Sequence, residues 1–107
     1  MQQISPQALQ AWLQDDARNQ PFLLDVREPW EYEYCHIEGS RLIPMGLIPQ
    51  QYETLDKAED VVVICHHGVR SYQVARFLEH YGFTQVYNLE SGIDGWAKDV
   101  NPAVRLY

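Results

Sequence analysis

One short segment constrains the possible fold of this chain more than any other. It is an apolar run followed by a cysteine and a tight loop. The run Val61–Ile64 is β-branched throughout, and Cys65 follows it directly. Residues 71–81 then place apolar side chains at the spacing of one helical face. The segment therefore predicts a strand, a loop and a helix, with Cys65 as the first residue past the strand.

The loop after this strand is the candidate site. Backbone N–H groups of such a loop converge with a helix N-terminus above the cysteine, and together they stabilise anions, a thiolate included. We therefore predict that Cys65 is a nucleophile held in an anion pocket. The residues expected to bind the substrate are His66, His67, Gly68, Val69, Arg70 and Ser71.

Individual loop residues have expected roles. Gly68 would let the backbone turn an N–H group inward. Arg70 is unfavourable beside the positive end of a helix dipole, so it is expected to face an anion. Ser71 is expected to be the N-cap of the helix, with a hydroxyl that can donate to the sulfur. His66 and His67 are expected to line the pocket, and neither is predicted to be a metal ligand.

The rest of the chain alternates between strand and helix patterns. Strands are expected at Phe22–Val26, Arg41–Ile43, Val61–Ile64 and Gln85–Leu89. Helices are expected after the cap Ser5, then at Glu28–Tyr34, Leu47–Leu55, 71–81 and Gly92–Lys98. This alternation predicts an α/β fold with a parallel sheet, in which ligands bind at the carboxyl ends of the strands. Residues 101–107 follow no pattern that would place them.

Composition narrows the functional classes. With 107 residues, 46% of them hydrophobic, we expect a single domain over residues 1–107. Two cysteines give neither a disulfide framework nor a zinc-type pair, so no metal or cofactor is predicted. A net charge of −7 disfavours nucleic acid and anionic membranes as partners. The sequence shows no signal peptide and no membrane span, so a reducing cytoplasm is the expected compartment.

The chain resembles the rhodanese family of sulfurtransferases in four segments that occur in the family's order. The segments are the loop 65–71, Leu24-Asp25-Val26-Arg27 with Glu31 and Tyr32, Cys35-His36-Ile37-Glu38-Gly39-Ser40, and Leu89–Trp96. The third is similar to the family's Gly-His-Ile-x-Gly-Ala stretch, and the fourth to its Leu-x-Gly-Gly…Trp pattern. The resemblance implies a parallel sheet of about five strands with helices on both faces.

The resemblance also implies a reaction. The Cys65 thiolate would attack the sulfane sulfur of a small anionic donor such as thiosulfate and would carry that sulfur as a persulfide. Cyanide or a cellular thiol would then accept the sulfur, and a protein acceptor is a further possibility. The residues themselves indicate only a thiolate in a pocket for a small anion.

Two alternatives remain open. The first is a phosphatase or arsenate reductase of the same fold, enzymes that use a longer Cys-x5-Arg loop. Here Cys65 and Arg70 form a Cys-x4-Arg loop. This smaller cradle suits one sulfur atom better than a tetrahedral oxyanion. The other alternative is a non-enzymatic sulfur carrier or a protein-binding module.

Some residues depart from the family pattern or have a structural interpretation. Cys35 replaces a glycine and could resolve a Cys65 persulfide as a disulfide, although an inert thiol is the preferred interpretation. Asp25 and Arg27 are expected to form a structural ion pair. Ser91 replaces a glycine, which affects only the local turn geometry.

Overall fold

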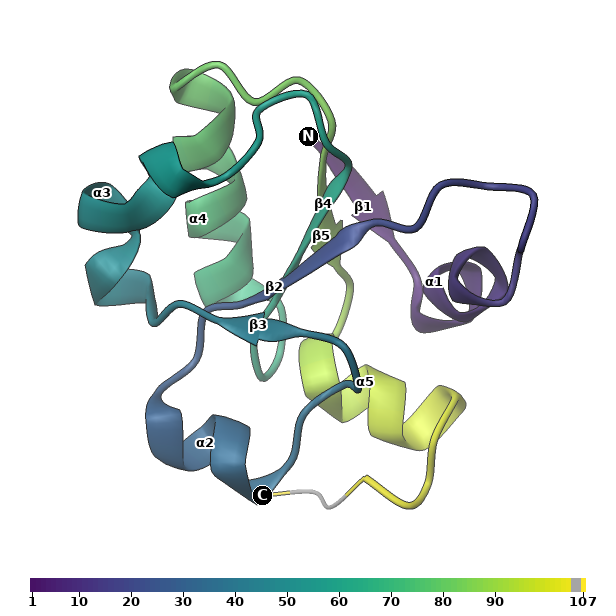
Figure 1. Ribbon diagram of the computed structural model, residues 1–107. Helices are drawn as coiled ribbons and strands as arrows, with labels where there is room; N and C mark the ends of the chain where they lie inside the picture. Colours follow the sequence, from purple (N-terminus) through teal and green to yellow (C-terminus); the bar gives the residue numbers. More distant parts are fainter. Residues whose placement is uncertain (105–106) are drawn as a thin grey trace.

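The computed structural model describes residues 1–104 and 107, and its elements alternate along the chain (Figure 1). The strands are β1 (Gln2–Ile4), β2 (Phe22–Asp25), β3 (Arg41–Leu42), β4 (Val61–Ile64) and β5 (Val86–Leu89). The helices are α1 (Pro6–Leu13), α2 (Pro29–Tyr34), α3 (Ile48–Gln51), α4 (Val69–His80) and α5 (Gly92–Asp99). Over these described residues, no helix is long and apolar enough to cross a lipid bilayer.

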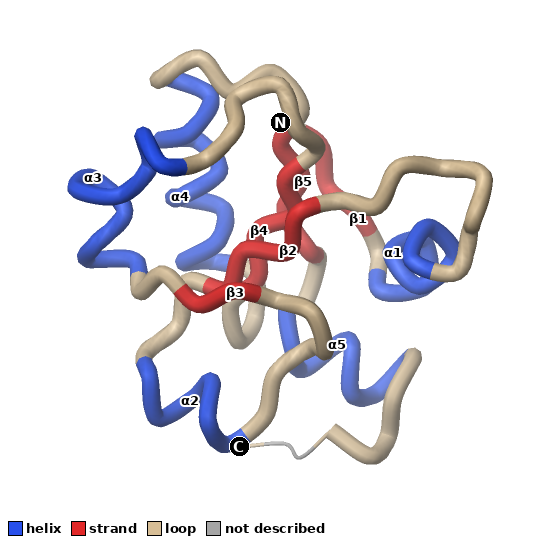
Figure 2. Tube along the Cα trace, viewed as in Figure 1, coloured by secondary structure: helices blue, strands red, loops and turns tan. Residues whose placement is uncertain are grey.

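The strands form one parallel sheet in the order β1-β5-β4-β2-β3 (Figure 2). The central strand β4 is buried along its whole length, as expected for a continuous apolar run covered on both faces. Its neighbour β2 is paired with it so that Leu23 lies opposite Val62 and Leu24 opposite Val63. Because Cys65 follows β4, the candidate nucleophile lies at the middle of the carboxyl edge of the sheet.

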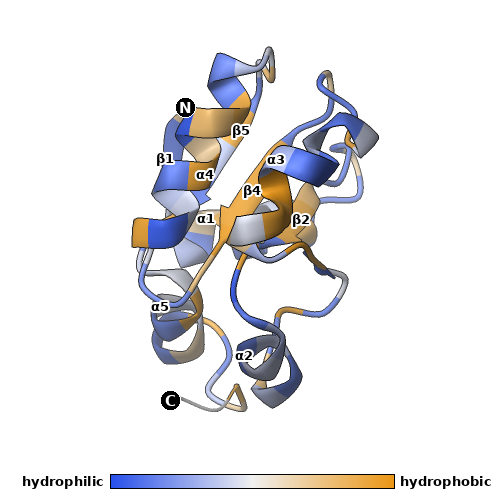
Figure 3. Cartoon of the chain, turned by 90° about the vertical axis from the view of Figure 1, so that its left-hand side faces the viewer, coloured by the Kyte–Doolittle hydropathy of each residue, from blue (hydrophilic) through white to orange (hydrophobic). Residues whose placement is uncertain are grey.

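The two faces of the sheet bury separate cores. On one face α4 packs through Val74, Ala75 and Leu78 against alternate residues of β2 and β4. On the other face α1 and α5 cover the remaining residues of the same strands, and Trp12 of α1 is buried in this cluster. Apolar segments gather in β4 and β2 and polar ones on the outer turns of the helices (Figure 3). The short helix α2 lies beyond the carboxyl edge, close to the loop after β4.

The predicted fold class is confirmed: the protein is α/β, with a five-stranded parallel sheet and helices on both faces. The predicted helix start is also confirmed, since the Ser5 hydroxyl accepts a hydrogen bond from the Ala8 N–H at 3.1 Å. Gly82 follows the cap of α4 with a φ of +98°, the left-handed conformation in which a glycine commonly ends a helix.

Other boundaries differ from the predictions. The edge strand β1 was not predicted, because three residues with one half-buried side chain carry too little alternation to indicate a strand. The helix predicted over Leu47–Leu55 is instead the single turn α3 between two 3-10 turns, Met45–Leu47 and Tyr52–Thr54. Pro49 has no N–H to donate to a carbonyl four residues earlier, so it cannot continue a helix from Met45, but it is tolerated in the first turn of a new helix, which favours such a broken path.

Candidate active site

The loop after β4 folds back over its own cysteine. The Gly68 N–H donates to the Cys65 Sγ at 3.0 Å, and the Ser71 Oγ lies 3.2 Å from the same sulfur. Gly68 caps α4 with a φ of +102°, a conformation that glycine adopts without strain and that turns its N–H toward the sulfur. The Gly68 N–H is therefore a direct donor to the sulfur of Cys65, whose side chain is almost completely buried, whereas the hydrogen of the Ser71 hydroxyl is donated to Asn88.

The prediction that Ser71 is the N-cap of the helix is wrong. The helix begins at Val69, two residues before the predicted range 71–81, and Gly68 is the cap. Ser71 consequently lies in the first turn of α4 and is fully buried. From that position its hydroxyl is directed to the interior of the loop, where it contacts the sulfur.

A buried asparagine fixes this hydroxyl. Ser71 donates to the side-chain carbonyl of Asn88, and the Asn88 amide nitrogen donates to the Gly68 carbonyl at 3.1 Å and to the Gln3 side chain at 3.0 Å. Sequence reasoning did not select Asn88, although it is the one amide within the otherwise non-polar Val86–Leu89 strand. We infer that Asn88 positions both Ser71 and Gly68 relative to the sulfur.

The first turn of α5 holds the other side of the loop. The Ile93 N–H donates to the Cys65 carbonyl at 2.8 Å, and the Asp94 N–H donates to the His66 carbonyl at 3.1 Å. These contacts satisfy N–H groups that a helix N-terminus leaves without partners. Because the C=O and N–H of one peptide unit point in opposite directions, the same contacts turn the N–H groups of residues 66 and 67 away from α5.

Arg70 has a partner that the sequence did not reveal. Its guanidinium donates to both carboxylate oxygens of Glu31, at 2.7 and 2.9 Å, from across the loop. Glu31 lies on α2 and is buried, and the bond to Arg70 is the largest cause that lowers the pKa of this carboxyl to about 2. The role of Arg70 in donor binding stays a prediction. Its guanidinium is already paired with Glu31 in the structure.

The ion pair predicted between Asp25 and Arg27 is present and fully buried. The Arg27 Nε donates to Asp25 at 2.9 Å, and one terminal nitrogen donates to it at 2.8 Å. The other terminal nitrogen donates to the Tyr107 hydroxyl at 2.7 Å. That hydroxyl in turn donates to Glu31 at 2.8 Å, so one network joins the structural ion pair to the Glu31–Arg70 pair.

Tyr107 belongs to the tail that no sequence pattern placed, of which residues 105 and 106 lie outside the described residues. Its ring stacks on His66 with centroids 3.9 Å apart and planes 12° apart. Burial raises the pKa of Tyr107 to about 12, so the hydroxyl keeps its proton at neutral pH. Tyr107 is therefore a hydrogen-bond donor to Glu31 beside the loop.

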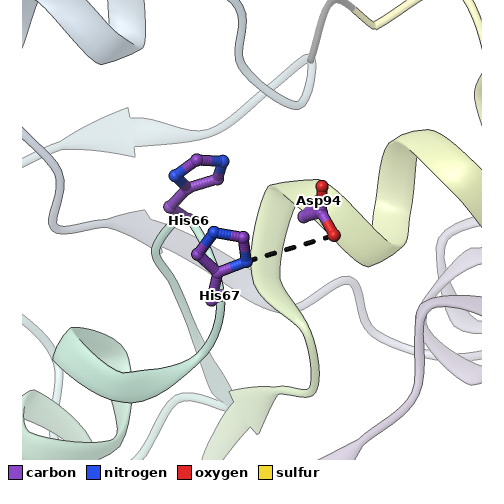
Figure 4. A group of neighbouring side chains, drawn as sticks. All are labelled: His66, His67 and Asp94. Atoms are coloured by element: carbon purple, nitrogen blue, oxygen red, sulfur yellow. Dashed lines mark ion pairs between the residues drawn. The ribbon is translucent and has the colours of Figure 1, made fainter. Parts of the chain in front are cut away.

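The two loop histidines lie next to each other, with His67 facing Asp94 of α5 (Figure 4), and they differ in exposure. His66 is sandwiched between Tyr107 and His67, and burial lowers the pKa of its imidazole, which favours the neutral form. His67 is exposed, with its Nδ1 4.0 Å from Asp94 on α5. Among the described residues, the buried Nε2 of His66 has no hydrogen-bond partner.

These histidines and Asp94 bring ligand-type atoms within 4.8 Å of one another. The imidazole planes are stacked at 25°, however, so one ion cannot lie near the plane of both rings. Asp94 is moreover paired with Lys98 at 3.0 Å. That neither histidine is a metal ligand remains a prediction, and this geometry supports it.

Cys35, the second free thiol, ends α2 and is half-buried. Its carbonyl accepts from Arg27 at 2.7 Å, and its sulfur lies 4.0 Å from another Arg27 nitrogen. The backbone of Cys35 thus has a structural role that does not require a thiol.

We expect Cys35→Ser to keep kcat for sulfur transfer within about threefold of the native value, because the contact to Arg27 is made by the backbone carbonyl. Steady-state kinetics with donor and thiol acceptor would measure it. A large loss of turnover while Cys65 is still loaded with sulfur would instead assign Cys35 the role of resolving thiol.

Beside the loop lies a cleft of about 500 Å³. Its walls come from loop residues 67–69, the first turns of α4 and the ends of β1 and β5. His67, Asn88 and Glu90 supply polar groups to it, and Tyr72 and Val69 supply apolar surface. A second reactant could approach the loop from this cleft.

Comparison with known proteins identifies the family of this chain. The chain belongs to the rhodanese-like domain family, whose sequence model matches residues 5–99. A putative sulfurtransferase of Bacillus subtilis, YtwF, is 37% identical over 102 residues, which cover 95% of this chain and 96% of that protein. A rhodanese-like domain protein from Staphylococcus aureus has a solved structure with a TM-score of 0.85 and 28% identity, covering 100% and 99% of the two chains.

Some relatives are much longer. The probable adenylyltransferase/sulfurtransferase MoeZ of Mycobacterium tuberculosis is 35% identical over 106 residues. These residues cover 97% of this chain but only 26% of MoeZ, so the chain spans about a quarter of that relative. The names of these relatives support sulfurtransferase activity in general.

Proposed function

We propose that this protein transfers a sulfane sulfur from a small donor such as thiosulfate to a thiophilic acceptor, through a persulfide on Cys65. The observation that carries the proposal is the sulfur of Cys65 at the carboxyl end of β4, with the Gly68 N–H at 3.0 Å and the Ser71 hydroxyl at 3.2 Å. The Gly68 N–H stabilises negative charge on this sulfur both before and during attack.

The proposed first step forms one sulfur–sulfur bond and breaks another. The Cys65 thiolate attacks the outer sulfur of thiosulfate, the sulfur–sulfur bond of the donor breaks, and its electron pair leaves with sulfite. In the second step cyanide or a thiolate attacks the outer sulfur of the persulfide, and the Cys65 thiolate is regenerated. Residues 66–71 form the proposed binding cradle in both steps, and neither step requires a cofactor or a metal.

Arg70 favours this reaction over the phosphatase alternative. A phosphatase of this fold would use the arginine of its loop to bind phosphate oxygens, whereas both oxygens of Glu31 already accept bonds from Arg70. The loop is also one residue shorter than the Cys-x5-Arg form. We further propose a reducing compartment such as the cytoplasm, because a buried thiolate of this kind has to stay reduced.

The deciding experiment is an intact-mass measurement after incubation with thiosulfate. We expect the protein to gain the mass of one sulfur atom and to lose it when cyanide is added, with thiocyanate as the product. Repeated turnover with excess donor and acceptor would separate an enzyme from a stoichiometric sulfur carrier. A protein that gains no sulfur from any donor would contradict the proposal.

A further inference from the structure

We infer that this site accepts donors with at most one negative charge, such as an alkyl persulfide, in preference to the dianion thiosulfate, and that Glu31 is the residue that determines this preference. The inference rests on the proposed sulfur transfer and names its donor class. It follows from one juxtaposition: the cation of the Cys65 loop, Arg70, is paired with a buried carboxylate from another helix.

The pair is close and complete. Both terminal nitrogens of Arg70 donate to Glu31, one to each carboxylate oxygen, so the planar guanidinium and the carboxylate bind through two parallel bonds. The Glu31 side chain is only 3% exposed, whereas that of Arg70 is 35% exposed. The opposite charges of Arg70 and Glu31 largely cancel, so the pair attracts a further anion only weakly.

Two further donors hold Glu31 in place. The Glu28 N–H donates to one of its oxygens at 3.0 Å, and the Tyr107 hydroxyl donates to the other at 2.8 Å. If Glu31 turned away from Arg70, a buried carboxylate would lose its counter-ion as well as these bonds. Arg70 is therefore not released simply because an anion arrives at Cys65.

Glu31 also stays charged at every pH at which a thiolate reaction can run. Its pKa is lowered to about 2, chiefly by the bond to Arg70. Within the loop 65–71, Arg70 is the only residue with a permanent positive charge, and burial favours the neutral form of His66. The whole chain has a net charge of −7 and therefore repels anions. The repulsion of a dianion such as thiosulfate is twice that of a monoanion at the same distance, because Coulomb energy is proportional to charge.

A singly charged donor reacts by the same balanced step. The Cys65 thiolate attacks the outer sulfur of R–S–S⁻, the bond between the two donor sulfurs breaks, and R–S⁻ leaves with the electron pair. Methanethiosulfonate is a convenient probe of this charge class, because it is thiosulfate with one oxygen replaced by a methyl group. Its sulfur passes to Cys65 in the same way, and methanesulfinate leaves.

The test compares Glu31→Gln with the native protein on thiosulfate and on methanethiosulfonate. The amide keeps the size of the side chain and an acceptor for the Glu28 N–H, but it removes the charge opposite Arg70. We expect kcat/KM for thiosulfate to rise by about tenfold, as one charge-assisted contact becomes available. We expect only about a threefold rise for methanethiosulfonate, since the Coulomb energy scales with the charge of the donor.

The ratio of the two kcat/KM values is the decisive measurement. It is independent of the fraction of folded protein, so it remains valid if Glu31→Gln lowers stability, and in a two-step covalent scheme it reports only the donor half-reaction. Glu33→Gln is the matched control: it removes an exposed carboxylate of the same helix, and we expect the ratio to stay within about twofold. Adding Arg70→Gln to Glu31→Gln should abolish the gain for thiosulfate.

The outcomes are distinct. A thiosulfate-selective gain in Glu31→Gln that disappears in the double variant supports the inference. An unchanged ratio in Glu31→Gln, with both donors still loading Cys65, overturns the donor preference but leaves the sulfur transfer intact. Failure of both probes to add sulfur to the native protein would overturn the sulfur transfer itself, together with the inference that rests on it.

Discussion

Replacing Cys65 by serine is expected to lower kcat/KM for sulfur transfer by roughly 10³-fold or more, and to abolish the gain of one sulfur atom after donor treatment. The Gly68 N–H donates to the sulfur of Cys65, and the Ser71 Oγ lies 3.2 Å from the same sulfur. A serine hydroxyl has similar size but ionises far less readily, and it cannot form a persulfide. Thiocyanate assays and intact-mass spectra of the same samples would measure both effects.

The matched control for this experiment is the other cysteine of the chain. Cys35→Ser makes the same chemical change in a half-buried thiol that the proposed reaction does not use. If Cys65→Ser kept its activity while Cys35→Ser lost it, the nucleophile would be Cys35 and the proposed mechanism would be wrong. Loss in both variants would show that the two thiols act in sequence.

The local structure around Cys65 could be predicted because signals in neighbouring residues determine it. A continuous β-branched run, a cysteine and a glycine-containing loop specify a buried strand with the candidate nucleophile at its carboxyl end, and β4 has the predicted bounds. The direction of the Gly68 N–H follows from the freedom of glycine at positive φ. These features depend on neighbours in the chain, so the pattern alone contains them.

The partners of the site residues could not be predicted in the same way. Glu31 pairs with Arg70 across 39 positions of sequence, and Tyr107 reaches Glu31 across 76. Such contacts depend on how α2 and the tail lie beyond the sheet edge, which no local periodicity specifies. For that reason the sequence could not reveal that the anion facing Arg70 is the carboxylate of Glu31.

Asn88 illustrates a signal that was present but not used. A buried amide in a central strand needs hydrogen-bond partners, because an unsatisfied polar group in the interior is costly. Its partners are Ser71, Gly68 and Gln3, which converge on the Cys65 loop. A polar residue within an apolar strand next to β4 is therefore a pointer to the site that sequence reasoning can apply.

The second large effect is expected from Gly92→Ala, far outside the loop in sequence. Gly92 begins α5 with a φ of +54°, and a Cβ there would overlap the Cys65 carbonyl and lie 2.6 Å from the carbonyl of His66. Both obstacles are backbone atoms, and both carbonyls accept the first N–H groups of α5. Neither side can give way without losing these hydrogen bonds, so the loop and α5 have to separate.

We expect Gly92→Ala to lower the free energy of unfolding by about 3 kcal/mol or more, through overpacking and the left-handed conformation together. The melting temperature should fall by roughly 12 °C or more, as thermal unfolding would show. In the protein that remains folded, kcat/KM should fall by about tenfold or more, because the loop that orients Cys65 has moved.

Two other glycines separate the causes of this loss. Gly39 has a φ of +86° with open space around its Cα, so Gly39→Ala should cost only about 1 kcal/mol, from backbone strain alone. Gly46 also has open space but no positive φ, so Gly46→Ala should change stability by less than about 0.5 kcal/mol. If Gly92→Ala cost no more than Gly39→Ala and left the kinetics unchanged, close packing of α5 on the Cys65 loop would not be what holds the site together.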